Sequence, residues 1–199
     1  MLDCLSGQTL GSAMSAQAQR LQFTVTDYHR MLDAGILAED DRVELVEGEI
    51  LRMAPVGSRH AAHVKRLNRL LNRELGDRAI VAVQDPIYVN DFSEPEPDLS
   101  ILRPRRDFYE RAHPGPEDVL WLVEVSNSSL QLDREVKLPL YARHRIPELW
   151  VVNVPETVVQ VFRSPRDGEY RERSEARHGE AISPQAFPEL KLRVDEILG

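Results

Sequence analysis

Two acidic residues, Asp98 and Glu124, occur where the sequence predicts buried β-strands. Glu124 lies in the apolar run 119–125, one residue before its end, and Asp98 directly follows Pro97 at the start of DLSIL. An ionised carboxylate that is buried without a partner is so unfavourable that it is normally neutralised or paired with a cation. If the two strands are neighbours with these ends aligned, the carboxylates lie roughly one strand spacing apart, about 5 Å.

This pair of carboxylates indicates metal-dependent phosphoryl chemistry. Carboxylates that close repel each other, so one of them takes up a proton unless a cation lies between them. Mg²⁺ binds one or two carboxylates together with water and phosphate oxygens, generates hydroxide near neutral pH, and stabilises charge on phosphorus. The structural alternatives are a turn or strand-end role for Asp98 and a buried ion pair between Glu124 and an arginine. The metal interpretation accounts for both residues at once.

Apolar periodicity and turn residues indicate the elements that position this pair. In the first half of the chain they predict a helix with Thr26 as N-cap and Gly35 as stop, a hairpin with strands at 43–46 and 49–53, a helix opened by Ser58 and closed by Gly76, and strands at 79–83, 86–89 and 98–102. In the second half they predict a strand at 119–125, a helix capped by Asp133 that runs to about Arg145, a strand in PELWVVNV, a hairpin of TVVQVFRS with GEYRERSEA, and a short helix at VDEIL.

Buried-type strands on both sides of a helix, with hairpins before and after, predict an α/β fold in which helices flank a mixed β-sheet. We expect a mobile N-terminal tail over residues 1–20 and a single domain over 21–199. The tail lacks the basic and apolar regions of a secretory signal, and no apolar run has membrane-spanning length. We therefore expect a cytoplasmic protein without a membrane partner.

Composition limits the chemistry further. The single cysteine, Cys4, excludes an intramolecular disulfide and a cysteine metal cage. The formal net charge of −8 argues against a protein that coats nucleic acid by bulk electrostatics, although a few arginines and a metal still suffice for contact with phosphates. We expect the connection 103–118 to form a flap over the site. Its segment RPRRDFYER is the one basic cluster with aromatic neighbours and a candidate for gripping a DNA backbone, although solvated loop charges are the default interpretation.

The segments EPEPDLSIL and LVEVSNSSLQLDREVKLPLYARHRIPELWVVN resemble the PD-(D/E)XK nuclease superfamily and, within it, the Uma-type family of putative restriction endonucleases. The resemblance covers about residues 23–198 and includes VELVEGEILRMAP with a following histidine. It implies a restriction-endonuclease-like sheet with an N-terminal hairpin and a C-terminal antiparallel hairpin. It also implies a nuclease that uses Mg²⁺, with Mn²⁺ as a substitute.

Carried over by residue, the resemblance implies Asp98 and Glu124 as metal ligands and Glu44 of the first hairpin as a third acidic contributor. Glu47 and Glu49 compete with Glu44 for that role. In an alternating strand Glu44 projects away from the more apolar side, which by itself leaves the choice open. His60 matches the histidine after the hairpin and is a candidate for binding phosphate or orienting Glu44, with a plain histidine at the start of a helix as the alternative. A zinc site formed by His60 and His63 lacks further ligands nearby.

The sequence departs from the superfamily motif at Ser126, where the signature has a lysine two residues beyond Glu124. The Uma-type pattern has a lysine on the following helix, and Lys137 fits it. A four-carbon side chain reaches from that helix to the water nucleophile or the scissile phosphate. The alternative is a surface lysine paired with Glu135 or Asp133.

The sequence therefore predicts a Mg²⁺-dependent endonuclease that hydrolyses DNA phosphodiester bonds, with Asp98, Glu124, Lys137 and Glu44 as its catalytic residues. A nuclease-fold protein that binds nucleic acid or a partner without strong catalysis is the alternative, and a phosphatase for small substrates is a third. We expect a homodimer, because one site per chain cuts two strands most easily as a pair. The sequence leaves open the target and the choice between DNA and RNA.

Overall fold

The computed structural model describes residues 20–38, 40–127 and 129–199, so that the predicted tail lies outside the described residues except for Arg20. The elements in the first half are α1 (Val25–Asp33), β1 (Val43–Val46), β2 (Glu49–Arg52), α2 (Ser58–Leu75), η1 (Gly76–Arg78), β3 (Ile80–Ala82) and β4 (Leu99–Leu102). Those that follow are η2 (Pro116–Asp118), β5 (Val119–Ser126), α3 (Leu130–Leu132), the π-helical segment η3 (Asp133–Lys137), α4 (Leu138–Arg143), β6 (Glu148–Asn153), β7 (Val158–Arg166), β8 (Glu169–Arg177), β9 (Ala181–Ile182), β10 (Leu192–Arg193) and α5 (Val194–Leu198).

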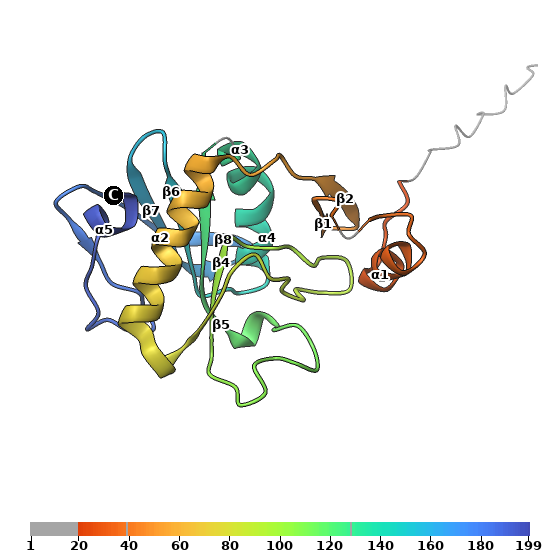
Figure 1. The fold of residues 1–199 in the computed structure, drawn as a ribbon, viewed down its shortest axis with the longest axis horizontal. Coiled ribbons are helices and arrows are strands. Elements are labelled where there is room, and N and C mark those ends of the chain that lie inside the picture. Colours follow the sequence, from red (N-terminus) through yellow and green to blue (C-terminus); the bar gives the residue numbers. More distant parts are fainter. Residues whose placement is uncertain (1–19, 39, 128) are drawn as a thin grey trace, which may run out of the picture.

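Six strands form one mixed sheet in the order β3-β4-β5-β6-β7-β8. Strands β5 and β6 are parallel, and every other neighbouring pair in this sheet is antiparallel. Parallel neighbours need a crossover connection, and α3, η3 and α4 provide it between β5 and β6 (Figure 1). Strands β1–β2 and β9–β10 form separate two-stranded sheets. The predicted mixed sheet with flanking helices and hairpins is confirmed.

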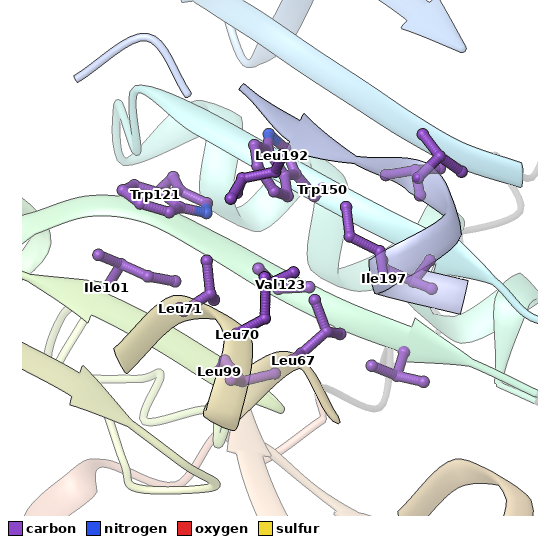
Figure 2. Packing of buried hydrophobic residues seen from close by; sticks show 14 of the residues in the cluster. Leu67, Leu70, Leu71, Leu99, Ile101, Trp121, Val123, Trp150, Leu192 and Ile197 are labelled. Carbon is purple, nitrogen blue, oxygen red and sulfur yellow. The ribbon is translucent and has the colours of Figure 1, made fainter. Parts of the chain in front are cut away.

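Helices cover both faces of this sheet because alternate residues of its central strands point to opposite sides. Leu67 and Leu71 of α2 pack with Val123 of β5 and with Ile197 of α5 on one face (Figure 2). The tryptophans of β5 and β6, Trp121 and Trp150, belong to the same cluster, and their ring centroids lie 5.7 Å apart. The opposite face forms a second cluster with α4, whose members include Leu122, Leu149, Leu140 and Tyr141. Strand β5 is therefore buried on both faces.

Two predicted boundaries in the first half are wrong. Helix α1 begins after Thr24 rather than Thr26, because Thr24 and Asp27 form a reciprocal capping box. Residues 86–89 do not form a strand. The backbone N–H groups of Ile87, Tyr88 and Val89 are bonded to loop carbonyls, so the segment is extended without joining the sheet.

The helix after β5 also differs from the prediction. Asp133 is not its N-cap, because the helix begins at Leu130 and Asp133 lies inside it. The Asp133 carboxylate accepts hydrogen bonds from the hydroxyls of Ser126 and Ser129, at 2.6 and 2.8 Å, instead of from free N–H groups of a first turn. The helix ends at Arg143, and Arg145 has a positive φ of 60°.

Among the described residues no helix is long and apolar enough to cross a membrane.

Candidate active site

Asp98 and Glu124 come together where the start of β4 meets the end of β5. The antiparallel register pairs Leu99 with Val123, so that Asp98 and Glu124 occupy the next positions along the two strands. The backbone N–H of Asp98 lies 3.4 Å from Glu124 Oε2, and the backbone N–H of Val125 donates to Asp98 Oδ2 at 2.8 Å. Both acidic side chains are buried. The predicted adjacency of the two strands is confirmed.

Lys137 inserts its ammonium group between two buried carboxylates. Its Nζ atom lies 3.1 and 3.2 Å from the two carboxylate oxygens of Glu44 and 3.3 Å from Glu124 Oε1. Lys137 is only 3% exposed, so it is not the surface lysine of the alternative interpretation. The π-helical segment places both of its ends, Asp133 and Lys137, in the interior.

The hairpin β1–β2 brings Glu44 to this cluster. Val43 and Leu45 face α1, while Glu44 on the other face reaches Lys137. A β-bridge between Leu45 and Glu94 holds the hairpin beside the segment that leads to β4. The two competing acids lie elsewhere: the exposed Glu47 and Glu49 form ion pairs with Arg143 and Arg20. Of the three hairpin acids, only Glu44 contacts the buried cluster.

His60, in the first turn of α2, orients Asp98 rather than Glu44. Its Nε2 atom lies 3.0 Å from Asp98 Oδ1, and its Nδ1 atom lies 2.9 Å from the carbonyl oxygen of Val125. The contact with Asp98 raises the pKa of His60, although burial acts in the opposite direction. Gln84 Nε2 also donates to Asp98 Oδ1 at 3.2 Å. His63 contacts its own helix at Arg59 O, so it does not pair with His60.

Sequence reasoning missed two polar side chains around this cluster, Tyr141 and Asp133. The hydroxyl of the fully buried Tyr141 donates to Glu124 Oε1 at 2.8 Å. Asp133 is fixed by two serine hydroxyls and lines the same pocket as Lys137. Asp133, Lys137 and Tyr141 recur every four residues, and side chains at that spacing share one side of a helix. This four-residue spacing is the sequence signal from which Asp133 and Tyr141 could have been found.

Burial and the neighbouring charges together set the pKa values in the cluster. Burial raises the pKa of Glu124 well above its usual range, while the charge of Lys137 acts to lower it. Burial acts to lower the pKa of Lys137, but the charges of Glu124 and Glu44 outweigh it and raise this pKa, so the ammonium stays protonated. Burial and the charge of Glu124 likewise raise the pKa of Tyr141. The cluster therefore contains more carboxyl groups than cationic groups.

These groups line one pocket between the hairpin and the start of α2. Its wall contains Glu44, His60, Gln84, Asp98, Glu124, Asp133 and Lys137, and its rim includes Arg42, Glu96 and residues 53–57. The connection 103–118 does not line it, so the prediction of a flap over the site is wrong. Strand β4 runs from the site toward Leu102, so this connection starts at the far end of the strand (Figure 1). There Arg105 stacks on the buried Tyr109 and pairs with Asp107.

The donor set suits a hard divalent cation, although the described residues contain no group of three His, Cys, Asp or Glu side chains arranged to hold a metal. Lys137 lies between Glu44 and Glu124, and Asp98 is turned toward Val125 N, His60 and Gln84. Carboxylate oxygens are nevertheless the ligands that Mg²⁺ and Mn²⁺ prefer. The oxygen donors of Glu44, Asp98 and Glu124 therefore fit Mg²⁺ or Mn²⁺ by their chemistry, while in this structure the same side chains contact groups of the protein.

The fold is of the mixed α/β class, with a six-stranded sheet flanked by helices. It matches the crystal structure of a putative nuclease belonging to DUF820 from Anabaena variabilis ATCC 29413, with a TM-score of 0.69 and 19% sequence identity over 88% of this chain and 97% of that one. At this identity the match establishes the fold alone. No curated protein matches the chain.

The chain belongs to the Uma2 family, described as putative restriction endonucleases, whose family model matches residues 25–195. The matched range contains each of the predicted site residues: Glu44, His60, Asp98, Glu124 and Lys137.

Proposed function

We propose that the protein is a metal-dependent endonuclease that hydrolyses DNA phosphodiester bonds. The observation that carries this proposal is the buried Lys137 ammonium between Glu44 and Glu124, beside Asp98, in a pocket of a chain that belongs to a nuclease family. Replacing a buried ion pair by apolar side chains of similar volume is often neutral or stabilising, so stability alone is a weak reason for such a cluster. A charged cluster that faces a pocket is a candidate for chemistry.

The charges in the pocket support a divalent cation. Glu44, Asp98 and Glu124 are three buried carboxylates, and Lys137 is the one lysine among them. Like charges at this range favour protonation of one carboxyl or the binding of a cation. We propose that oxygens of Glu44, Asp98 and Glu124 hold Mg²⁺ or Mn²⁺. When bound, such a cation supplies Lewis acidity and a water of lowered pKa.

The chain's own residues then have distinct roles. Lys137 places positive charge where a scissile phosphate oxygen becomes more negative, which stabilises the transition state. In this chain Ser126 stands where the superfamily motif has a lysine, and its hydroxyl donates to Asp133 in the same helix that carries Lys137. His60 fixes the orientation of Asp98, and Tyr141 fixes that of Glu124. His60 is therefore a positioning residue.

Two conservative substitutions test the proposal. Asp98→Asn and Glu124→Gln keep the shape of each side chain, so each should abolish Mn²⁺-dependent nicking of supercoiled plasmid while the protein stays folded by circular dichroism. Wild-type nicking that survives in both variants would contradict the proposal. If the wild type binds DNA but leaves the plasmid intact with Mg²⁺ and with Mn²⁺, the protein is the non-catalytic binding module instead.

We further propose that the active species is a homodimer, since the described part of each chain forms one such pocket and duplex cleavage requires two cuts. Sedimentation velocity with and without a DNA duplex measures this directly. A monomer under both conditions that still makes double-strand breaks would contradict it.

A further inference from the structure

Helix α2 presents a basic stripe to solvent although the chain as a whole is acidic. From Ser58 to Arg73 this helix contains arginines and a lysine but no acidic residue, whereas the net charge of the chain is −8. Its cations are exposed and fall at helical spacing on the outer side of the helix. We define the basic stripe as Arg59, Lys65, Arg66, Arg69 and Arg73.

The opposite face of α2 explains why these cations share one side. Leu67, Leu70 and Leu71 point into the core against the sheet (Figure 2). With the apolar face buried, the polar positions of the amphipathic helix must face outward. The stripe spans fourteen steps of the helix, or about 21 Å at 1.5 Å per residue. That is roughly two thirds of one turn of B-DNA, which measures about 34 Å.

The middle of the stripe has cations without acidic partners. Arg73 is engaged with Glu74 and Glu196, and Arg66 donates to the carbonyl oxygen of Leu198. Within the described residues, neither Lys65 nor Arg69 forms an ion pair or a side-chain hydrogen bond. Arg69 shares a surface hollow with Asp195 and Glu196, but these two acids pair with Arg193 and Arg73. Two exposed cations about one helical turn apart that form no ion pair of their own are suited to contact successive groups of a polyanion.

The stripe begins at the rim of the candidate active site. Gly57, the N-cap of α2, and His60 in its first turn both line the pocket. Arg59 lies between them in sequence and is exposed. The helix therefore leads from Asp98, which His60 contacts, outward along the surface (Figure 1).

We propose that the basic stripe of α2 binds the sugar-phosphate backbone of the DNA whose phosphodiester bond enters the pocket, with Lys65 and Arg69 as its main phosphate contacts. This inference rests on the proposed nuclease function and adds to it the surface along which the substrate lies. It also resolves the conflict between net negative charge and a polyanionic substrate, because the cations are concentrated on one helix face. The loop 103–118, at the far end of β4, is not needed for this contact.

The stripe fits a nucleic-acid backbone better than an anionic membrane. A helix that lies in a membrane interface buries an apolar face among the lipids. The apolar face of α2 is already buried against the sheet, and the exposed positions between the cations of the stripe are Ala62 and Asn72. Only the charges remain available to a partner.

The test is the salt dependence of DNA binding. Fluorescence anisotropy with a labelled 30-base-pair duplex in EDTA, over a range of NaCl concentrations, gives Kd and its slope without cleavage. For duplex DNA each phosphate contact contributes about 0.9 to the slope of log K against log salt. The double variant Lys65→Gln/Arg69→Gln should therefore lower the slope by about 1.8 and weaken binding tens-fold near 0.1 M salt, by the same counterion arithmetic.

The matched control is Arg171→Gln/Arg173→Gln on the edge strand β8, which removes the same charge from exposed positions. It should leave the slope almost unchanged. Equal effects of the two double variants, an unchanged slope in the α2 variant, or no DNA binding by the wild type would each overturn the inference. So would equally tight, Lys65- and Arg69-dependent binding to phosphatidylglycerol vesicles, which would assign the stripe to membranes.

Cleavage separates this inference from the nuclease proposal. If the stripe only binds substrate, Lys65→Gln/Arg69→Gln should nick plasmid at the wild-type single-turnover rate once DNA is saturating. If DNA binding depends on the basic stripe as expected but no nicking occurs, the role of the stripe stands and the nuclease proposal is contradicted. If the wild type nicks plasmid but the α2 variant has an unchanged salt slope, the nuclease proposal stands and the role of the stripe is contradicted.

Discussion

Lys137 and Glu44 are 93 residues apart in sequence, yet the ammonium of one lies 3.1 Å from a carboxylate oxygen of the other, with both side chains buried. The contact connects the N-terminal hairpin to the crossover helix between β5 and β6, two parts of the chain that share no sheet. Because Lys137 also contacts Glu124, one side chain joins three elements at the candidate site.

If Lys137 stabilises negative charge in the transition state, Lys137→Met should reduce the single-turnover rate of plasmid nicking under saturating Mn²⁺ by about 10²-fold, or roughly 3 kcal/mol. Lys137→Arg should restore little, because a guanidinium differs in shape from an ammonium and hardly ever loses its proton. The exposed Lys191→Met is the control and should react at the wild-type rate. Equal rates for Lys137→Met and wild type would remove Lys137 from the chemistry.

The same variant should also be less stable without metal. Removing one partner of a buried ion pair leaves an uncompensated charge and typically costs about 3–5 kcal/mol. Lys137→Met should therefore unfold at lower urea in EDTA than the wild type, and Mn²⁺ should recover part of the difference if the carboxylates bind it. A loss that is equal with and without Mn²⁺ would argue against a metal among Glu44, Asp98 and Glu124.

Glu124 should make the stability of the metal-free protein depend on pH. Burial raises the pKa of its carboxyl well above the usual range, so the folded state holds this proton more tightly than the unfolded chain does. Stability from this group is therefore lost as the pH rises from the unfolded pKa, about 4.3, toward the raised folded value. Glu124→Gln removes the titration. Between about pH 5 and pH 8 in EDTA, its unfolding free energy from urea titrations should fall less than that of the wild type; equal changes would contradict the prediction.

The convergence of Asp98 and Glu124 was predictable because two apolar strands each carried one acid at an end. We expected them to be neighbours because two buried carboxylates can share one cation, whereas each alone would need its own partner. The same convergence also predicts the position of the connection 103–118. If the start of β4 meets the end of β5, the two strands are antiparallel, so Leu102 and the loop after it lie at the other end of β4. The expected flap was inconsistent with this geometry.

Local boundaries failed where two neighbouring signals competed. Thr24 and Thr26 are both good N-caps, and only the reciprocal bond with Asp27 distinguishes them. Asp133 resembles a cap in sequence, but its carboxylate is used by two serines inside the structure. Residues 86–89 have β-branched side chains suited to a strand, yet loop carbonyls occupy their N–H groups. Each case was decided by particular hydrogen bonds that the residue types alone do not specify.

Glu44 should be the one acid of the hairpin that matters for metal binding. It is 4% exposed beside Lys137, whereas Glu47 is exposed and paired with Arg143. Calorimetric titration with Mn²⁺ should show strongly weakened binding in Glu44→Gln and wild-type binding in Glu47→Gln, with nicking following the same order. If only Glu47→Gln weakened Mn²⁺ binding, the metal ligand would be Glu47 and our assignment of Glu44 would be wrong.

Tyr141 should support the reaction by holding Glu124. Its hydroxyl donates to Glu124 Oε1 at 2.8 Å, and the ring is fully buried. Tyr141→Phe removes only this donor and leaves a buried oxygen of Glu124 without that partner, so it should destabilise the protein by about 1–3 kcal/mol. It should also slow nicking, because the carboxylate loses one of its orienting partners.

Tyr170→Phe is a matched control, since the Tyr170 hydroxyl donates at 2.9 Å to the carbonyl oxygen of Ile146, which does not line the active-site pocket. Urea unfolding and single-turnover nicking on both variants separate the two effects. We expect a stability loss in each variant and slower nicking only in Tyr141→Phe; equal nicking rates in the two would make Tyr141 a purely structural residue.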